Sequence, residues 1–459
     1  MLRDAVMSRV GGLGLLAAAL LGPAAHADEL GCRPHPIRWQ DDCSDWSDRE
    51  LTGLDRLRYV PMGGGGQAWL TVGGELRIQT ETFSDSSFGL EAERRYAQVG
   101  RRLLANADLR HGDGWRLFGQ LISVGEDGRE PGPRAQDRDA LDIQQLFIDA
   151  SVRLGPVDLT LRLGRQEISL SGNRLISTRD GVVVRRAFQG VLVEARAAGA
   201  RLTAFDLRPM EGAPGVLDDR PIDRESFHGL SLDLPQGKAG LTTLFLFDRD
   251  RPEAHYVGYD GHERRRTLGA RWSRAAETWD AYAQGAYQWG EAGGQPVRAS
   301  GGMAGVGFNW PGARALRLAT GVAFASGDRR RGDGRIQTFD PVYPSNYGFS
   351  DAPLIYQTNY VTASAEGSVR VGRARIGAMA YALARYSDGD AIYQAARPLT
   401  ATLDTGRPTA WLLQASGRIP LHRRVEFYGA LVRGIAGRGI DRAGGHNVTY
   451  SRLQLTARF

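Results

Sequence analysis

A period-two alternation of apolar and polar residues recurs along most of the chain, and it constrains the fold more than any other feature. Residues 157–163 read VDLTLRL, so that every second residue is apolar. Successive side chains of a β-strand point to opposite faces, and such a segment therefore has one apolar and one polar face. No segment reaches the roughly 18 consecutive apolar residues that a membrane-spanning helix requires. Alternating segments of about ten residues are instead typical of strands in a transmembrane β-barrel.

Eighteen candidate strands follow one another between residue 68 and the C-terminal Phe459. They start near residues 68, 94, 114, 141, 157, 186, 200, 225, 239, 263, 277, 299, 314, 359, 374, 409, 422 and 447. Short turns, such as residues 111–113, 155–156 and 372–373, alternate with long connections. The long connections lie near 127–140, 167–185, 208–223, 249–262, 327–358, 388–408 and 435–446. Barrels of bacterial outer membranes combine short periplasmic turns, long extracellular loops and an even number of strands.

The sequence therefore predicts an all-β fold, a transmembrane antiparallel β-barrel of about 18 strands over residues 67–459, surrounded by lipid in the outer membrane of a Gram-negative bacterium. Two segments fit the alternation poorly. Residues 239–248 are apolar at almost every position, and Arg101 has the same parity as the apolar Val99 and Leu103. The chain ends on Phe459 in an alternating strand, which resembles the terminal signal used in outer-membrane assembly.

The N-terminus has the pattern of a secretory signal peptide. Arg3 and Arg9 precede an apolar run over residues 10–21, and the small-residue site Ala25-His26-Ala27 follows it. We predict a signal peptide over residues 1–27, cleaved after Ala27. The alternative, an N-terminal membrane anchor, is disfavoured because the run is short and is followed by the helix breakers at 22–23.

Residues 28–66 are predicted to form a periplasmic N-terminal segment. They contain the only two cysteines of the chain, Cys32 and Cys43, which we expect to form a disulfide because the chain is secreted. Two cysteines without nearby paired histidines make a poor zinc site. No metal, cofactor or nucleic-acid partner is predicted.

The interior of an 18-stranded barrel is an aqueous channel, and strand parity indicates which side chains line it. The formal net charge is +6 and Lys238 is the only lysine, so nearly all cations are arginines, which hold carboxylates with a fixed fork geometry. Parity points these arginines inward: Arg77, Arg102, Arg110, Arg153, Arg162, Arg271, Arg317, Arg452 and Arg458. It also points these acids inward: Glu75, Glu81, Asp108, Asp149, Asp158, Asp233 and Asp280. Each arginine could contribute to an anion-selective constriction or stiffen the wall through a cross-strand ion pair.

Two long connections could shape the channel. Connection 167–185 is rich in charges and could fold into the pore or remain a solvated surface loop. Connection 327–358 places Arg329, Arg330 and Arg331 before Tyr343, Tyr347, Phe349 and Tyr356. These aromatic residues suit stacking on carbohydrate, and a belt at the membrane interface would explain them equally well.

Two motifs resemble the alginate export family. The first is LRYVPM at 57–62 followed by WLTVGGELR at 69–77. The second is GRQE at 164–167 followed by RLI at 174–176 and RDG at 179–181. The likeness spans the chain from about residue 50 to Phe459. The near absence of lysine departs from the mixture of lysine and arginine expected of such a pore.

The resemblance implies an eighteen-stranded barrel with an electropositive pore, through which an anionic uronate polysaccharide leaves the periplasm. It also implies a periplasmic helical-repeat scaffold as a secretion partner. The candidate pore residues that the motifs add are Arg77, Arg165, Arg179 and Asp180. Parity puts Arg165 on the lipid side with Leu163, unless the strand bulges at Gly164 or ends there.

Three functions remain open at this point. The first is a passive channel that exports alginate or an alginate-like polyuronate. The second is an anion-selective porin for the uptake of small anionic solutes. The third is an outer-membrane barrel enzyme, for which His228 and Ser231 are the candidate pair. No catalytic motif stands out in the sequence, and we expect a channel without enzymatic activity.

Overall fold

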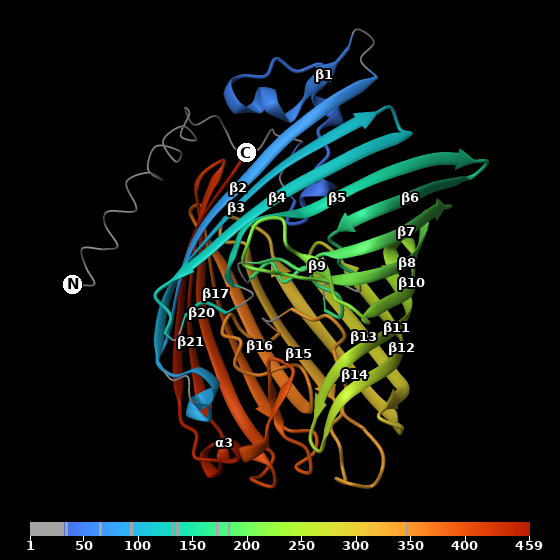
Figure 1. Cartoon of the computed structure of the whole chain (residues 1–459). Coiled ribbons are helices and arrows are strands. Elements are labelled where there is room, and N and C mark those ends of the chain that lie inside the picture. The colour runs from blue at the N-terminus through green and yellow to red at the C-terminus, as the bar shows by residue number, and fades with distance from the viewer. Residues whose placement is uncertain are drawn as a thin grey trace.

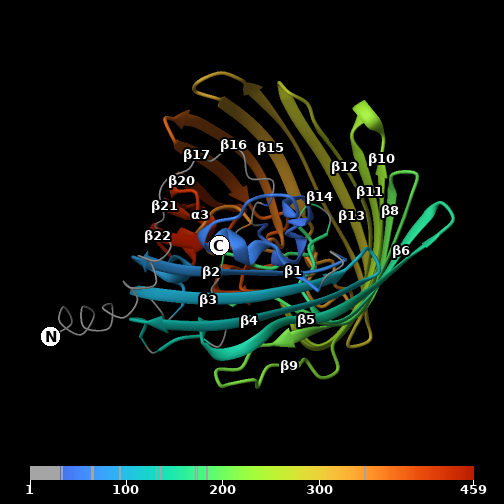
Figure 2. The ribbon, with the colours of Figure 1, turned by 90° about the horizontal axis from the view of Figure 1, so that it is seen from above.

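The fold is known from a computed structural model that describes residues 32, 35–63, 67–91, 95–130, 132–134, 137–170, 172, 174–181, 184–345 and 348–459. The predicted signal peptide lies outside these residues. Eighteen long antiparallel strands form the wall of a closed barrel (Figures 1 and 2). Within the described residues, no helix is both long enough and apolar enough to cross a membrane.

The strands of the wall have the following bounds: β2 (Ala68–Phe83), β3 (Tyr96–His111), β4 (Trp115–Asp127), β5 (Asp139–Leu154), β6 (Val157–Gln166), β7 (Phe188–Ala197), β8 (Ala200–Glu211), β10 (Ser226–Pro235), β11 (Leu241–Tyr256), β12 (Tyr259–Ala275), β13 (Trp279–Ala292), β14 (Gln295–Trp310), β15 (Leu316–Ala325), β16 (Tyr360–Val371), β17 (Ala374–Ala384), β20 (Pro408–His422), β21 (Val425–Ala436) and β22 (Val448–Arg458). Each pairs with the next wall strand in the chain, and β2 also pairs with β22, from Glu75 opposite Arg458 to Phe83 opposite Tyr450. This last pairing closes the sheet, as predicted, and every strand starts within four residues of its expected position.

The chain also forms short helices and strands outside the wall. They are η1 (Arg38–Gln40), η2 (Ser44–Trp46), η3 (Gly53–Arg58), β1 (Val60–Met62), η4 (Ser86–Gly89), β9 (Arg220–Pro221), η7 (Gly237–Ala239), β18 (Ile392–Gln394), β19 (Arg397–Leu399), η8 (Thr400–Thr402) and α3 (Arg438–Arg442). Elements η1 to η3 and β1 lie at the end with the short turns, where the C-terminus also lies, and α3 lies at the end with the long connections (Figure 1).

One predicted long connection is wrong. Residues 249–262 belong to β11 and β12, which continue as a hairpin and leave only Val257 and Gly258 between them. The many charged residues suggested a loop, but they pair across the two strands: Arg251 Nη2 lies 3.0 Å from Glu263 Oε1 and Arg264 Nη2 lies 3.2 Å from Asp248 Oδ2. The pairing shifts register between Arg251 and Ala254, which also interrupted the alternation.

The outer face carries an apolar band with aromatic residues near both ends. Trp115 and Trp310 are exposed beside short turns, and Tyr287 and Trp411 are exposed nearer the long connections. Such girdles mark the two interfaces of a membrane barrel. Arg101 does face outward with Val99 and Leu103, and its guanidinium lies 3.2 Å from the carboxylate of Asp127 at the end of β4.

The inner face explains the apolar segment at 239–248. Leu244 and Leu246 are exposed on the outer face, whereas Phe245 and Phe247 are buried inside the barrel. The inner phenylalanines pack in an aromatic cluster with Phe188, Phe205, Phe227 and Tyr343. Tyr343 belongs to connection 326–359, so this segment is apolar on both faces because a loop packs against it from within.

Gly164 allows β6 to pass close to β5. Its φ is +132°, and a Cβ atom there would overlap the carbonyl oxygen of Leu146 and lie 2.8 Å from the Cα of Phe147. We predict that Gly164→Ala lowers the stability of the refolded barrel by about 1–3 kcal/mol, because the left-handed backbone and the close contact both disfavour a side chain. Urea unfolding in detergent micelles measures the change.

The matched control is Gly285→Ala in β13, where nothing lies within 4 Å of the added Cβ and φ is not positive. Equal unfolding midpoints for the two variants would contradict the assigned strain at Gly164.

Candidate functional site

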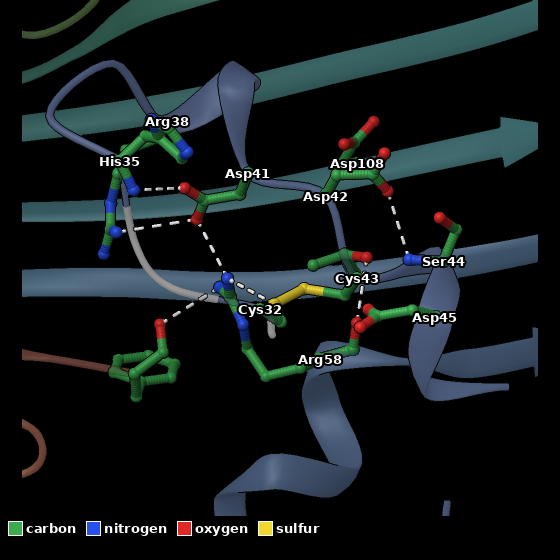
Figure 3. Close-up of a disulfide and its surroundings, with 12 residues drawn as sticks. Cys32, His35, Arg38, Asp41, Asp42, Cys43, Ser44, Asp45, Arg58 and Asp108 are labelled. Atoms are coloured by element: carbon green, nitrogen blue, oxygen red, sulfur yellow. Dashed lines mark hydrogen bonds and ion pairs between the residues drawn. A yellow bond between two sulfur atoms is a disulfide. The ribbon is translucent and has the colours of Figure 1, made fainter. Parts of the chain in front are cut away.

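The N-terminal segment is fastened to the end of the barrel with the short turns. Cys32 and Cys43 are joined by a disulfide, and the guanidinium of Arg58 lies beside it (Figure 3). Arg58 Nη2 donates to Cys32 Sγ at 3.2 Å and to Asp41 Oδ2 at 2.9 Å. Arg58 Nη1 donates to the backbone carbonyl of Phe459 at 3.3 Å, so one arginine links the disulfide loop to the last residue of the wall.

Part of this segment enters the barrel, as its contacts with inward residues show, and in the view from above the segment lies within the outline of the wall (Figure 2). Arg38 Nη2 donates to the carbonyl of Gly74 at 2.7 Å, and Trp39 Nε1 donates to the carbonyl of Glu167 at 3.0 Å. The indole of Trp39 lies 3.8 Å from the guanidinium of Arg162 and edge-on to the ring of Phe147. The segment therefore meets, inside the barrel, the beginning of the connection that runs from β6 to β7.

Connection 167–187 folds into the barrel and is not a solvated surface loop, which was the alternative that the sequence left open. It is hydrogen-bonded to the second inward connection, 326–359: Ser177 N donates to Tyr343 O at 2.9 Å and Tyr343 N donates to Leu175 O at 2.8 Å. Tyr343 and Phe349 are buried in the interior cluster and do not form an interface belt. Tyr347 lies outside the described residues.

Connection 326–359, between β15 and β16, is held to β11 by charge. Asp340 Oδ2 lies 2.8 Å from Arg251 Nη2, and Arg249 Nη1 donates to the carbonyl of Val342 at 2.8 Å. Burial raises the pKa of Asp340, but Arg251 and Arg249 outweigh it and hold the pKa below its ordinary value. Asp340 is therefore ionised at neutral pH and fixes this connection across the interior.

An ion-pair layer crosses the middle of the interior. It consists of Glu75, Arg77, Arg102 and Arg458 from the wall and Glu167, Asp180 and Arg185 from connection 167–187. Asp180 is its centre: Arg77 Nη1 donates to its backbone carbonyl at 2.7 Å, Arg102 Nη2 donates to its Oδ1 at 2.9 Å, and Arg185 pairs with it too. Burial raises the pKa of Asp180, but Arg77, Arg185 and Arg102 hold it well below its ordinary value.

The other two carboxylates complete the layer. Glu75 lies 3.3 Å from Arg77 Nη2 and 2.9 Å from Arg458 Nε, and Glu167 Oε2 lies 2.6 Å from Arg185 Nη2. Four arginines thus face three carboxylates, and the layer keeps one positive charge in excess. Because the arginines of the wall are paired with an acid of a connection, the layer both fixes the connection and obstructs the interior.

A cavity lies on each side of the layer. The turn-side cavity, about 430 Å³, is lined by Trp69 of β2, and the loop-side cavity, about 460 Å³, by Glu81 of the same strand, with Arg77 between them. The arginines of the turn-side cavity are Arg110, Arg116, Arg162, Arg196 and Arg201. The arginines of the loop-side cavity are Arg129, Arg134, Arg179, Arg186 and Arg397.

The loop-side cavity contains a cation held by carbonyl oxygens. Arg186 Nη1 donates to the backbone carbonyls of Ser177, Tyr343 and Pro344, at 2.9, 2.5 and 3.2 Å. Among the described residues, no carboxylate forms an ion pair with Arg186. Burial and the nearby charge of Arg179 both lower the pKa of Arg186, so an anionic ligand would be favoured here.

The inward arginines predicted by parity do not all meet in one place. Arg77, Arg102 and Arg458 meet with Asp180 in the ion-pair layer, and Arg110 and Arg162 line the turn-side cavity. Arg153 and Arg317 form cross-strand pairs at 2.6 Å with Asp158 and Asp280, and Arg162 pairs likewise with Asp149 at 2.7 Å.

Three other candidate residues lie apart from the layer. Arg271 lies over the ring of Tyr282, with its guanidinium carbon 5.0 Å from the centroid, and Arg452 lies beside Tyr428 at 5.7 Å. Arg165 stands opposite the exposed Leu146, in the outward register that parity gave it, and its Nη1 reaches Asp142 Oδ1 at 2.8 Å. Arg179, by contrast, lines the loop-side cavity.

Sequence reasoning missed several residues of the site. Arg38 and Trp39 belong to the segment expected to stay outside the barrel, and Arg129, Arg134 and Arg397 lie in long connections, where no parity applies. His228 and Ser231 do not form a pair: His228 is exposed on one face of β10 and Ser231 is buried on the other.

Solved structures with the same fold are outer-membrane porins. OccAB1 of Acinetobacter baumannii has 10% sequence identity and a TM-score of 0.55, over 84% of this chain and 96% of that one. OccK8 (OprE) of Pseudomonas aeruginosa has 12% identity and a TM-score of 0.54, over 85% and 98%. OccK2 (OpdF) of the same organism, solved in complex with glucuronate, has 13% identity and a TM-score of 0.53, over 85% and 98%.

No curated protein matches the chain. The family model described as alginate export matches residues 68–434, which include every wall strand from β2 to most of β21. The closed barrel, its apolar outer band and this match together identify an integral β-barrel of the outer membrane. The chain belongs to the alginate export family.

Proposed function

We propose that this barrel is a passive channel through which an anionic polysaccharide, alginate or an alginate-like polyuronate, leaves the periplasm. The observation that carries the proposal is Arg186, a half-buried cation beside Arg179. The hydrogen bonds of Arg186 go to backbone carbonyls, and three further arginines line the same cavity. A uronate carboxylate would supply the missing counter-charge. Family membership supports the substrate class, and so does the glucuronate bound by a porin of the same fold.

The mechanism requires no bond chemistry and no cofactor. Each uronate residue presents one carboxylate, and a guanidinium holds a carboxylate through two parallel charge-assisted hydrogen bonds. The arginines of the turn-side and loop-side cavities would replace part of the hydration that the polymer loses on entry. Sites of this kind pass a polymer only if each is weak, because tight binding at one residue would stop the chain.

The ion-pair layer would act as the barrier of this path. Asp180 accepts hydrogen bonds from Arg77, Arg102 and Arg185, as a substrate carboxylate would. Asp180 belongs to a connection and not to a wall strand. A polymer that enters from the turn side would compete with Asp180 for these arginines. Exchange of one carboxylate for another keeps the arginines paired throughout, so the connection could move aside without leaving buried charges uncompensated.

Uptake of small anionic solutes is the second candidate function. The same arginines would serve it, and the porin solved with glucuronate favours it specifically. The two functions differ in what blocks the channel: a polymer contacts both cavities at once, whereas a monomer contacts one. A periplasmic helical-repeat scaffold remains the proposed secretion partner, and the N-terminal segment lies on the side where it would dock.

The first prediction concerns recognition of the polymer. In planar bilayers, oligouronates on the turn side should block the current of the wild-type channel, and Arg179→Ala or Arg186→Ala should weaken the block by roughly tenfold, the loss of about one charge-assisted contact. Arg186→Lys should keep part of the block because it keeps the charge. Arg331→Ala is the control, since Arg331 is exposed and pairs with Asp404.

Block by glucuronate as strong as block by the oligomer would support uptake of small anions. Equal block by a neutral oligosaccharide of the same length would contradict both functions.

The second prediction concerns the barrier. Asp180→Asn should raise the conductance or the open probability, because the neutral amide holds Arg77, Arg102 and Arg185 less strongly than the carboxylate does. Asp158→Asn is the matched control: it removes the same kind of ion pair, with Arg153, from an exposed site on the wall. If Asp180→Asn and Asp158→Asn change the conductance equally, the layer is not the barrier.

The third prediction is the pH dependence of that barrier. The pKa of Asp180 is lowered in the closed layer, so its contribution to closure is fully present above the ordinary pKa of 3.8 and is lost as the pH falls below it. Conductance recorded from pH 8 to pH 5 should therefore stay constant, and it should rise only in stronger acid. A transition near neutral pH that disappears in Asp180→Asn would contradict this assignment.

A further inference from the structure

A gap in the wall is filled by a loop at the far end of β5. Strand β6 ends at Gln166, opposite the middle of β5, so residues 139–144 have no wall strand on that side. Connection 212–225 supplies the missing partner: Ala140 N and Leu141 N donate to Gly215 O at 3.2 and 3.3 Å, and Leu217 N donates to Leu141 O at 2.9 Å. This docking brings two acids of the connection against the strand.

Three carboxylates converge where the connection meets β5. The ligand oxygens of Asp142, Asp218 and Asp219 all lie within 4.8 Å of one another. Asp142 is buried, and the other two are half-buried. Asp219 N donates to Asp142 Oδ2 at 2.9 Å, which fixes the backbone of the connection beside the strand.

A fourth, buried carboxylate lies near this cluster and feels its charge. Asp139 is 0% exposed, and neither of its carboxylate oxygens has a hydrogen-bond partner in the part of the chain that the structure describes. The charges that act on it most strongly are those of Asp219, Asp142 and Asp218. Oδ1 of Asp218 is likewise buried and without a partner. Buried carboxylates of this kind are normally paired with a cation or bound to a metal.

The cation already present does not balance these charges. Arg165 Nη1 lies 2.8 Å from Asp142 Oδ1, and its Nη2 donates to the backbone carbonyl of Asp219 at 3.2 Å. One guanidinium therefore faces four carboxylates. The remaining donors are all oxygens, with no histidine or cysteine in the cluster, and such a set suits a hard divalent cation.

We propose that Asp142, Asp218 and Asp219, with the buried Asp139 beside them, form a binding site for Ca²⁺, in preference to Mg²⁺. Ca²⁺ accepts six to eight oxygen ligands in irregular geometry, whereas Mg²⁺ demands a near-ideal octahedron that a strand and a docked loop do not supply. The cation clamps connection 212–225 onto β5. Gln144 of the same strand donates to Glu167 at 2.9 Å, so the clamp also supports the wall beside the ion-pair layer.

Calorimetric titration of the full-length protein tests the site. The protein is refolded in phosphatidylcholine, without anionic lipid, stripped with EDTA, and titrated with CaCl₂ or MgCl₂. We expect one Ca²⁺ per chain with a Kd on the order of 10⁻⁴ to 10⁻³ M, as in extracellular modules, and weaker binding of Mg²⁺. Ca²⁺ should also raise the midpoint of thermal unfolding.

Asp218→Asn with Asp219→Asn should abolish the calcium response, and Asp223→Asn, at an exposed acid of the same connection, should leave it intact. Asp139→Asn removes the neighbouring buried charge: it should raise the metal-free unfolding midpoint and reduce the increase that Ca²⁺ produces. Absence of calcium binding in the wild type, or full binding in the Asp218/Asp219 double variant, would overturn the proposal. Equal affinity for Mg²⁺ would overturn the preference for Ca²⁺.

Discussion

Backbone N–H and C=O groups in the hydrocarbon core of a membrane have no water to bond with, and the pairing of β2 with β22 satisfies the last two edges of the sheet. All other features depend on this closure. It fixes which face of every strand meets lipid, and it encloses a space wide enough to hold connections and the N-terminal segment. It also brings Glu75 opposite Arg458, so the seam of the barrel contributes two members of the ion-pair layer.

The enclosed space carries more arginine than the wall can neutralise by itself. Wall pairs such as Arg162 with Asp149 stiffen the sheet, whereas Arg77 and Arg102 share one wall acid, Glu75, and need a second acid from elsewhere. Asp180 supplies one from a connection. The pairing of inward arginines with Asp180 therefore explains both why connection 167–187 folds inward and why it obstructs the interior of the channel. On the loop side, no acid of the described residues pairs with the carbonyl-held Arg186, and the substrate is proposed to provide one.

The strands could be predicted from the sequence because lipid imposes an apolar residue at every second position. Arg77 and Arg102 lie on the inner face, where parity placed them. Arg101 was a poor fit to the alternation because it shares the parity of Val99 and Leu103, and it does lie on the outer face with them. Parity failed in β11 and β12, where cross-strand ion pairs gave a strand the composition of a loop. Strand parity also predicts nothing about the connections between strands. The direction of the Arg186 side chain and the entry of Trp39 into the barrel depend on tertiary contacts, which leave no periodic pattern in the sequence.

The reversal potential of the open channel across a tenfold KCl gradient tests most directly whether the arginines of the interior make it a path for anions. We expect a potential of the sign that chloride preference produces, and a smaller potential in Arg179→Ala and in Arg186→Ala. A potential of the opposite sign, for preferred passage of potassium, would contradict the account and leave only the barrel.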